Sequence, residues 1–442
     1  MKKNTVNLEK KLGEESSSTG AFEERVIIVH DYYRISEKSH SVRELSGLAR
    51  SAGGKVGCYI RLSQRSTHRK TFVGSGKVSE IRAAIIQFSS TLVIFERPLT
   101  PIQERDLEQQ LNCRVIDRVR LILDIFALRA RTREGKMQVE LAQLQHMSTR
   151  LVRGWSHLER QRGGIGLRGP GETQLETDRR LLGVRIKRLK KQLDRVSSQR
   201  TLHRRRRQRK PIPVVSLVGY TNAGKSSLFN QLADADVYVA DQLFATLDPT
   251  IRRIEVPEFG SVLLSDTVGF IRQLPASLVK AFRATLEEIV ASQLLIHVVD
   301  FSQVDYKERI EEVELVLNEI GALKIPRITI FNKIDLTEKS PSIIRSSSDL
   351  PKKLWLSAET GEGTELLWRA LLSYLGSSRK IRRLLLSQRS GKFRSKLYDL
   401  ADVREERVDE EGNWVVEVLI DSEAEGRLNA LESSGEVFSW VD

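Results

Sequence analysis

One segment restricts the possible folds of this chain more than any other. An apolar stretch that begins at Val214 runs directly into Gly219-Tyr-Thr-Asn-Ala-Gly224-Lys225-Ser226, and a helical pattern follows. The glycines let the backbone turn closely enough for successive N–H groups to point at phosphate oxygens, while Lys225 supplies a cation and Ser226 a hydroxyl for Mg²⁺. The alternative for so short a pattern is an ordinary glycine-rich turn. Its place between a strand and a helix favours a phosphate-binding loop in an α/β domain.

A second apolar segment brings a carboxylate to the expected position of the metal. Residues 261–269 read as a strand that ends in Asp266, whose carboxylate can hold a water of the Mg²⁺ shell, and the N–H of Gly269 can face the γ-phosphate. A helix cap is the commoner role of a single aspartate after a strand. The order of the elements that follow decides between the two roles.

The next strands supply a site for a guanine base. After the strand 294–300, the apolar segment from Arg327 ends in Asn332-Lys333-Ile-Asp335, at the edge where open α/β sheets bind ligands. The Asp335 carboxylate can accept two hydrogen bonds from the ring N–H and amino group of guanine, whereas adenine presents no such donor pair. A last strand and loop, through Ser357 and Ala358, would cover the base. Together these elements predict a GTPase domain over residues 211–375, with His297 as an ordinary core histidine.

The residue after Gly269 bears on the rate of hydrolysis. Many GTPases place there a glutamine that orients the attacking water, whereas this chain has Phe270, which cannot do so. The water must therefore be positioned by another residue, by the loop around Thr246 or by a partner. We predict slow turnover of the isolated protein, on the order of 10⁻⁴ to 10⁻² s⁻¹, and strong stimulation by the right partner.

The charge of the chain divides it into a basic and an acidic part. The net charge is +14, yet the first 210 residues carry +23, while residues 211–375 carry −6 and residues 376–442 carry −3. A basic half of this kind approaches polyanions. Two isolated cysteines and the lack of a long uncharged apolar run predict a cytoplasmic protein without stable membrane insertion. We expect a monomer.

The basic half begins with a polar leader over residues 1–23 and continues with alternating strand and helix patterns over residues 24–118. The alternation predicts a small, mostly parallel α/β domain. Within it, the segment Phe72-Val-Gly74-Ser-Gly76-Lys77 has the glycines and lysine of a phosphate site but not the spacing. We interpret it as a turn that opens a helix.

Residues 119–210 change to long helices with two apolar stripes at heptad spacing, which predicts an antiparallel helical hairpin. The glycine-rich stretch 160–172 between the stripes would form its tip, and a dense basic block precedes the proline-marked boundary at residue 211. Arginines at such a tip can contact the phosphates or bases of folded RNA, and the alternative for the tip is a solvated linker. The alternatives for the basic block are a solvated face or contact with an acidic membrane surface. The candidate RNA contacts are Arg160, Arg162, Arg168, Arg204, Arg205, Arg206 and Arg207.

Five stretches are more specific than the generic motifs: residues 121–127, 129–136, 138–145, 163–180 and 266–272. The chain resembles the HflX family of ribosome-associated GTPases, in the Obg-HflX-like superfamily, over nearly its full length. These five stretches carry the most specific part of the resemblance. The resemblance implies a GTPase that uses Mg²⁺, binds the rRNA and proteins of the large (50S) ribosomal subunit and is activated by it. It also implies that such a protein splits or rescues stalled ribosomes under stress. Finally, it implies that Thr246 is the switch threonine, whereas the residues alone leave Thr250 an equal candidate.

The motifs and the resemblance together define the expected site. Its catalytic residues are Lys225, Thr246 and Gly269, and its metal ligands are Ser226, Thr246 and Asp266. The full set of expected nucleotide contacts is Gly219, Tyr220, Thr221, Asn222, Ala223, Gly224, Lys225, Ser226, Ser227, Phe244, Ala245, Thr246, Leu247, Asp248, Asp266, Thr267, Val268, Gly269, Asn332, Lys333, Ile334, Asp335, Ser357 and Ala358.

Residues 376–442 predict a small α+β domain to which the sequence assigns no chemistry. Two further functions stay open beside ribosome splitting. The first is an assembly or checkpoint GTPase that binds the large subunit and uses hydrolysis as a release timer, and the second is a membrane-recruited signalling GTPase.

Overall fold

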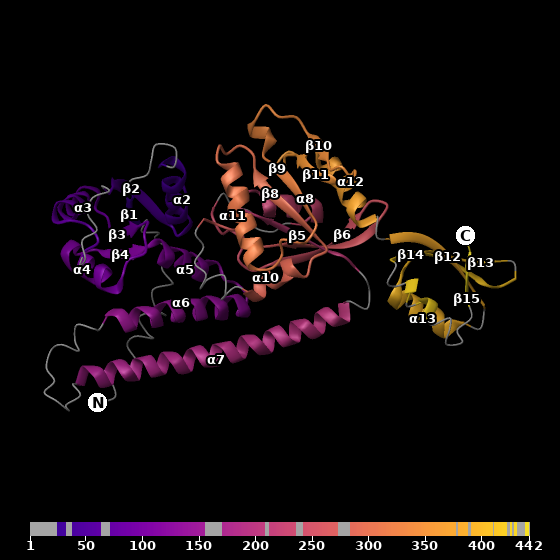
Figure 1. Cartoon of the computed structure of the whole chain (residues 1–442), viewed down its shortest axis with the longest axis horizontal. Helices are drawn as coiled ribbons and strands as arrows, with labels where there is room; N and C mark the ends of the chain where they lie inside the picture. Colours follow the sequence, from indigo (N-terminus) through magenta and orange to yellow (C-terminus); the bar gives the residue numbers. More distant parts are fainter. Residues whose placement is uncertain are drawn as a thin grey trace. The chain divides into compact units, whose positions relative to one another are not determined.

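The computed structural model of the protein contains two compact units, residues 1–121 and 122–442 (Figure 1). The described residues are 24–31, 38–62, 71–154, 170–207, 212–235, 242–272, 283–376, 379–387, 390–409, 411–421, 425–426, 428–430 and 438–441. The expected leader, residues 1–23, lies outside them. None of the described helices is long and apolar enough to cross a lipid bilayer.

The first unit contains a four-stranded, fully parallel sheet in the order β2-β1-β3-β4. Strand β1 contributes four consecutive buried residues, Val26 to Val29, as expected for a strand covered by helices on both faces. The expected parallel α/β domain is therefore confirmed. Its elements are β1 (Glu24–His30), α2 (Lys38–Ser51), β2 (Gly54–Arg61), α3 (Ser75–Phe88), β3 (Leu92–Phe95), α4 (Pro101–Leu111) and β4 (Arg114–Asp117).

Local capping chemistry explains where two helices of this unit begin. Thr100 caps α4 through a reciprocal pair of hydrogen bonds with Gln103, and Pro101 occupies the first helical position. Gly74 is the N-cap of α3, and Lys77 forms an ion pair with Glu80 one turn later. The glycine-rich segment before α3 is therefore a helix-opening turn, as the sequence predicted.

Two long helices follow α5 (Arg118–Arg129): α6 (Arg133–Gly154) and α7 (Pro170–Arg207). Glu140 of α6 and Arg185 of α7 form an ion pair of 2.6 Å, 14 residues before the end of α6 and 15 residues after the start of α7. The two helices run antiparallel to each other (Figure 1), and this ion pair joins them. The heptad stripes are only partly buried, since Leu141 and Leu189 are buried whereas Leu182, Ile186 and Leu193 are half-buried.

The predicted tip of this hairpin lies outside the described residues, and so do Arg160, Arg162 and Arg168. Arg204, Arg205, Arg206 and Arg207 are the last residues of α7, and their side chains also lie outside the described part.

The largest sheet has seven strands in the order β10-β11-β9-β8-β5-β7-β6 (Figure 1). Five strands are parallel, and the edge strands β6 and β10 are antiparallel to their neighbours. The elements are β5 (Val214–Gly219), α8 (Lys225–Ala233), β6 (Thr250–Val256), β7 (Gly260–Asp266), α10 (Arg283–Val290), β8 (Leu294–Asp300), α11 (Tyr306–Glu319), β9 (Arg327–Asn332), the 3₁₀ turn η1 (Ile334–Leu336), β10 (Ser342–Arg345), β11 (Pro351–Trp355) and α12 (Thr364–Leu375).

The central strand β8 is buried at every position, including His297, which is 1% exposed. Burial lowers the pKa of His297 to about 3, and the positive charges of Arg327 and Lys225 lower it further. The ring is therefore neutral at physiological pH. The prediction of a core histidine is confirmed.

The C-terminal residues form a four-stranded antiparallel sheet, in the order β13-β14-β12-β15, with helix α13. Its core includes Leu384, Phe393 and Val416, and the ring of Phe393 stacks on that of Phe438 with centroids 4.7 Å apart. The strand β15 was not anticipated from the sequence. The elements are β12 (Arg379–Leu386), α13 (Gly391–Leu400), β13 (Asp402–Val408), β14 (Trp414–Asp421) and β15 (Phe438–Val441).

Candidate nucleotide-binding site

The phosphate-binding loop lies between the end of β5 and the start of α8, and two positions in it require glycine. Gly219 has a φ of +150°, and an added Cβ would lie 2.2 Å from the carbonyl oxygen of Val298. Gly224 has a φ of +91°, and its Cβ would lie 2.2 Å from the Nδ2 atom of Asn332. Both positions are strained for any L side chain. The loop therefore packs directly against the ends of β8 and β9.

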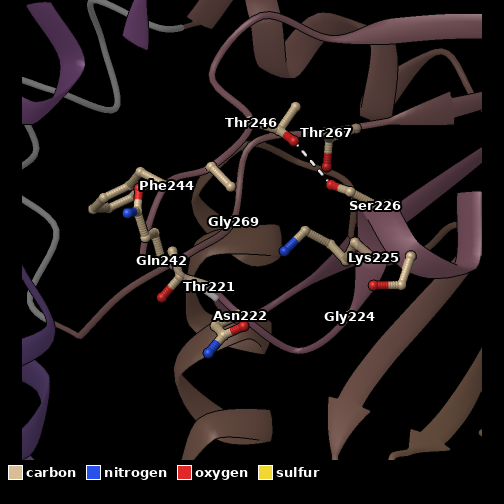
Figure 2. A pocket seen from close by; sticks show the side chains of 12 residues that line it. Thr221, Asn222, Gly224, Lys225, Ser226, Gln242, Phe244, Thr246, Thr267 and Gly269 are labelled. Carbon is tan, nitrogen blue, oxygen red and sulfur yellow. Dashed lines mark hydrogen bonds between the residues drawn. The ribbon is translucent and has the colours of Figure 1, made fainter. Parts of the chain in front are cut away.

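Lys225, at the first position of α8, points its amine into the cavity (Figure 2). The Nζ atom donates to the carbonyl oxygens of Tyr220, at 2.8 Å, and Gly219, at 3.3 Å. Burial lowers the pKa of Lys225 to about 8, and the nearby Asp266 carboxylate opposes this shift. An anionic phosphate in the cavity would favour the charged amine.

Three oxygen-bearing side chains meet at one point of the site. The Ser226 hydroxyl lies 2.9 Å from that of Thr246, drawn as a dashed line in Figure 2, and donates to Asp266 Oδ2 at 2.7 Å. Thr246 also donates to Asp266 Oδ2, at 3.2 Å. Hydroxyl and carboxylate oxygens are the ligands that Mg²⁺ prefers. The structure therefore brings together the three expected metal ligands.

Asp266 itself has the features of a cation ligand. It is fully buried, and its Oδ1 atom has no hydrogen-bond partner among the described residues. Burial raises the pKa of this carboxyl, while Lys225 and the hydrogen bonds from Ser226 and Thr246 lower it. A buried carboxylate with an unpartnered oxygen is costly unless a positive group joins it. The donor set thus fits a hard divalent cation.

Phe270 is fixed against the phosphate-binding loop by its own backbone. Its N–H donates to the Gly219 carbonyl at 3.1 Å, and its carbonyl accepts from the Thr221 N–H at 2.8 Å. The side chain is 1% exposed. The preceding Gly269 leaves no room for a side chain, because an added Cβ would lie 2.7 Å from the Thr221 Cα atom and 2.9 Å from the Lys225 Nζ atom. The ring of Phe270 is therefore enclosed by the protein, and it has no polar atom that could orient an attacking water.

Asn332 joins the base side of the site to the phosphate side. Its Nδ2 atom donates to the carbonyl of Ala223 at 2.9 Å, and its Oδ1 atom accepts from the Ala358 N–H at 2.8 Å. Asn332 is 1% exposed, so its amide is committed to this internal role. The side chain thereby holds the loop after β11 in register with the phosphate-binding loop.

Asp335 keeps its carboxylate at the surface. One oxygen accepts a hydrogen bond of 2.5 Å from Ser357, which leaves the rest of the carboxylate open to a base. Lys333 has a φ of +64° and forms a 2.9 Å ion pair with Asp300 at the end of β8. This pair holds the Lys333 amine at the end of β8.

Several expected contact residues use their side chains elsewhere. Thr267 lines the cavity, yet its hydroxyl donates to the Leu217 carbonyl at 2.6 Å. Leu247, Val268 and Ile334 are buried in the protein, so only their backbone can face a nucleotide. The carboxylate of Asp248 accepts hydrogen bonds from Arg131 and Thr132, just before α6, rather than facing the phosphate loop.

Two residues of the site had not been identified from the sequence. Gln242 lines the cavity beside Phe244 (Figure 2), and Asp300 pairs with Lys333. Gln242 lies in an irregular loop, and no sequence pattern marks it. Asp300 ends an apolar strand, and that position was a signal in the sequence that could have identified it. The cavity is lined by Thr221, Asn222, Gly224, Lys225, Ser226, Ser227, Gln242, Phe244, Ala245, Thr246, Thr267 and Gly269.

Comparison with known proteins gives three consecutive family matches. Residues 39–127 match a GTP-binding GTPase N-terminal region, residues 129–207 a GTP-binding GTPase middle region, and residues 214–333 a 50S ribosome-binding GTPase. Among solved structures, a GTP-binding protein from Sulfolobus solfataricus in complex with GDP is 24% identical. The match covers 80% of this chain and 99% of that one, with a TM-score of 0.45.

Curated relatives match over most of the sequence. The GTPase HflX of Escherichia coli (strain K12) is 50% identical over 396 residues, which cover 89% of this chain and 93% of that protein. The GTPase HflX of Magnetococcus marinus is 48% identical over 369 residues, 83% of this chain and 85% of that protein. The site geometry and these relatives agree on GTP hydrolysis as the reaction. The chain therefore belongs to the HflX family of GTPases.

Proposed function

We propose that this GTPase uses Mg²⁺, binds the large (50S) ribosomal subunit, is activated by it, and splits or rescues stalled ribosomes under stress. In this proposal it acts as a monomer in the cytoplasm. The description of the family model over residues 214–333, a 50S ribosome-binding GTPase, supports the choice of partner. The observation that carries the proposal is the buried Phe270, which cannot orient the attacking water and so leaves that task to another group, which we propose the partner supplies or reorders.

In the proposed reaction, Lys225 neutralises charge on the β- and γ-phosphates. Mg²⁺, held by Ser226 and Thr246 and by the carboxylate of Asp266, would supply electrostatic stabilisation of the charge that develops on the transferred phosphoryl group. The Gly269 N–H faces the γ-phosphate, and Asp335 accepts hydrogen bonds from guanine. These roles use the side chains of the phosphate and metal site, the carboxylate of Asp335 and one backbone N–H, and they leave the attacking water without a group that aligns it.

The missing contribution is the alignment of the attacking water. A residue after Gly269 could do this only with a polar side chain that faces the γ-phosphate, and Phe270 faces the interior. The isolated protein should therefore turn over slowly, on the order of 10⁻⁴ to 10⁻² s⁻¹, as unassisted GTPases do. A partner that reorders the loop around Thr246 or inserts its own group would accelerate the reaction.

The surface of α7 supports a polyanionic partner. Between residues 177 and 196 its basic side chains are exposed to solvent, and the same stretch has only two acidic residues, Asp178 and Asp194. Such a surface binds nucleic-acid phosphates with an affinity that falls steeply as salt rises. The basic residues are Arg179, Arg180, Arg185, Lys187, Arg188, Lys190, Lys191 and Arg195. We propose that this face, with the tip arginines Arg160, Arg162 and Arg168 and the block Arg204 to Arg207, contacts rRNA.

The proposal is tested by measuring GTP hydrolysis with and without purified 50S subunits across a salt series. The wild type is compared with a chain that lacks residues 162–171 and with a chain in which Lys190 and Lys191 are glutamine. Stimulation by 50S subunits that weakens with salt and in both variants is expected. Hydrolysis that is indifferent to 50S subunits and to whole ribosomes would require the ribosomal assignment to be withdrawn.

Separation of 70S particles into subunits in a density gradient distinguishes splitting from assembly. A splitting factor converts 70S particles into subunits in the presence of a GTP analogue. An assembly or checkpoint factor binds the large subunit without changing the 70S fraction.

A further inference from the structure

The loop that carries Thr246 has a second face, which contacts the junction between α5 and α6. The Asp248 carboxylate accepts hydrogen bonds from the N–H groups of Arg131, at 2.9 Å, and Thr132, at 2.8 Å, and from the Thr132 hydroxyl at 2.6 Å. These partners are about 116 residues away in the sequence. The metal-binding face of the loop and its helix-binding face are thus separated by only two residues, from Thr246 to Asp248.

The contact has the chemistry of a helix cap. Thr132 directly precedes the first residue of α6, and its hydroxyl oxygen accepts from the Gly135 N–H at 2.9 Å. The first N–H groups of a helix have no partner within the helix, and negative charge beside them is favourable. Asp248 therefore supplies, from a distant segment, a carboxylate at the start of a 22-residue helix.

Two further contacts hold the same loop to α5. The rings of Phe244 and Phe126 pack edge to face with centroids 4.7 Å apart, and both are 2% exposed. The Arg129 guanidinium donates to the Gln242 side-chain oxygen. Phe244 and Gln242 also line the phosphate cavity. Residues 242–248 therefore form a segment with the cavity on one side and the α5–α6 junction on the other.

We propose that Asp248 is a positioning residue through which helix α6 and the nucleotide control one another. When Thr246 engages the metal and the γ-phosphate, Asp248 stays on the start of α6. When the γ-phosphate leaves, Thr246 loses its partner and the cap is released. This inference rests on the role proposed above for Thr246. Because coupling is reciprocal, a partner that displaces the start of α6 weakens GTP binding by the same factor by which GTP weakens the binding of that partner.

The structure offers a substitution that breaks the cap without touching the nucleotide site. At Gly135 an added Cβ would lie 2.2 Å from the Asp248 Oδ1 atom and 3.1 Å from the Thr132 Oγ1 atom. The Gly135→Ala change therefore pushes away the end of one side chain, which the fold tolerates. Gly183→Ala in α7 is the matched control, since no atom lies within 4 Å of its added Cβ. Both changes raise helix propensity.

The experiment measures the affinities of the full-length protein for GDP and for a non-hydrolysable GTP analogue, both in excess Mg²⁺. Gly135→Ala and Asp248→Ala are expected to weaken analogue binding roughly 2- to 30-fold, the range for loss of a capping side chain, and to leave GDP binding unchanged. Gly183→Ala should change neither affinity. Unchanged analogue binding in Gly135→Ala overturns the proposal, and so does an equal loss of both affinities, which would mean that the contact serves only folding.

Two further measurements separate this inference from the proposed role of Thr246. In hydrogen exchange, the amides of residues 131–135 should be better protected with the analogue than with GDP, and Gly135→Ala should abolish the difference. Equal protection in both states overturns the inference. If Thr246→Ala leaves the ratio of the two affinities unchanged, the assignment of Thr246 is wrong. If Thr246→Ala lowers the affinity for the GTP analogue relative to that for GDP and Gly135→Ala does not, only the coupling through Asp248 is refuted.

Discussion

Nucleotide affinity should fall with rising pH because of the buried amine of Lys225. In the nucleotide-free protein, burial lowers the pKa of this amine to about 8. A bound triphosphate requires the ammonium form and holds its pKa well above the range of the experiment. Above pH 8 the protein must therefore take up a proton when it binds GTP. The affinity is constant well below pH 8 and decreases at most tenfold per unit above it.

The size of the effect follows from the fraction of charged amine. At pH 7 about ten in eleven Lys225 side chains carry the charge, and at pH 9 about one in eleven does. The dissociation constant for GTP should therefore rise roughly tenfold between pH 7 and pH 9. The sign is fixed, because a depressed lysine pKa favours the neutral form that cannot pair with phosphate.

A fluorescent GTP analogue titrated at several pH values measures this dependence. Lys225→Arg provides the control, because guanidinium stays charged throughout this range and any titration of the guanine ring affects both proteins equally. The wild type should lose about tenfold more affinity than the arginine variant over the two units. Parallel pH profiles for the two proteins would refute the argument, because the amine of Lys225 would then be charged throughout.

Three further predictions concern the same domain. Asp335→Asn removes the carboxylate that pairs with guanine, and the loss of two charge-assisted hydrogen bonds should weaken GTP binding roughly 10²- to 10⁴-fold in a competition assay, while a xanthine nucleotide gains affinity. Ser226→Ala should raise the Mg²⁺ concentration for half-maximal GTP binding about tenfold, with little change in metal-free GDP binding; an unchanged Mg²⁺ requirement would exclude Ser226 as a ligand. His297, with a pKa of about 3 when folded and 6.5 when unfolded, is neutral in the folded protein, so stability is intact above pH 6.5 and falls below it. At pH 5 the loss is about 2 kcal/mol. The unfolding transition that belongs to the GTPase domain is the one that GDP shifts. His297→Leu should remove this pH dependence from the denaturant midpoint of that transition.

Local sequence patterns were sufficient to predict the central strands of the GTPase sheet and the phosphate-binding loop. The apolar strand before Gly219, the glycine spacing up to Ser226 and the polar end of β9 each depend on residues close in sequence. Those patterns specify a strand, a turn and the edge of a sheet whatever the rest of the chain does. The expected metal ligands Ser226 and Asp266 meet because the parallel strands β5 and β7 deliver their carboxyl ends to one edge, and Thr246 joins them from the loop before the antiparallel strand β6.

The edge strands and the second face of the Thr246 loop could not be predicted in the same way. In strand β6 the buried Ile254 and Val256 alternate with the exposed Arg253 and Glu255, and β15 has only four residues, so neither shows a long apolar run. The contacts of Asp248 with Thr132 and of Phe244 with Phe126 join segments more than a hundred residues apart. Nothing in the local sequence around Asp248 distinguishes a phosphate neighbour from a helix cap, because a carboxylate serves both.

If the proposed function holds, the buried ring of Phe270 also determines how long a molecule loaded with GTP lasts. At a turnover on the order of 10⁻³ s⁻¹, bound GTP survives for roughly ten minutes. A freely diffusing protein meets an enormous number of macromolecules in that interval and leaves nearly all of them with its nucleotide intact. Hydrolysis then depends on one kind of encounter and not on the time since GTP was bound. Because the Phe270 side chain is buried, the bound nucleotide under this proposal stays GTP until the protein contacts its partner and is GDP afterwards.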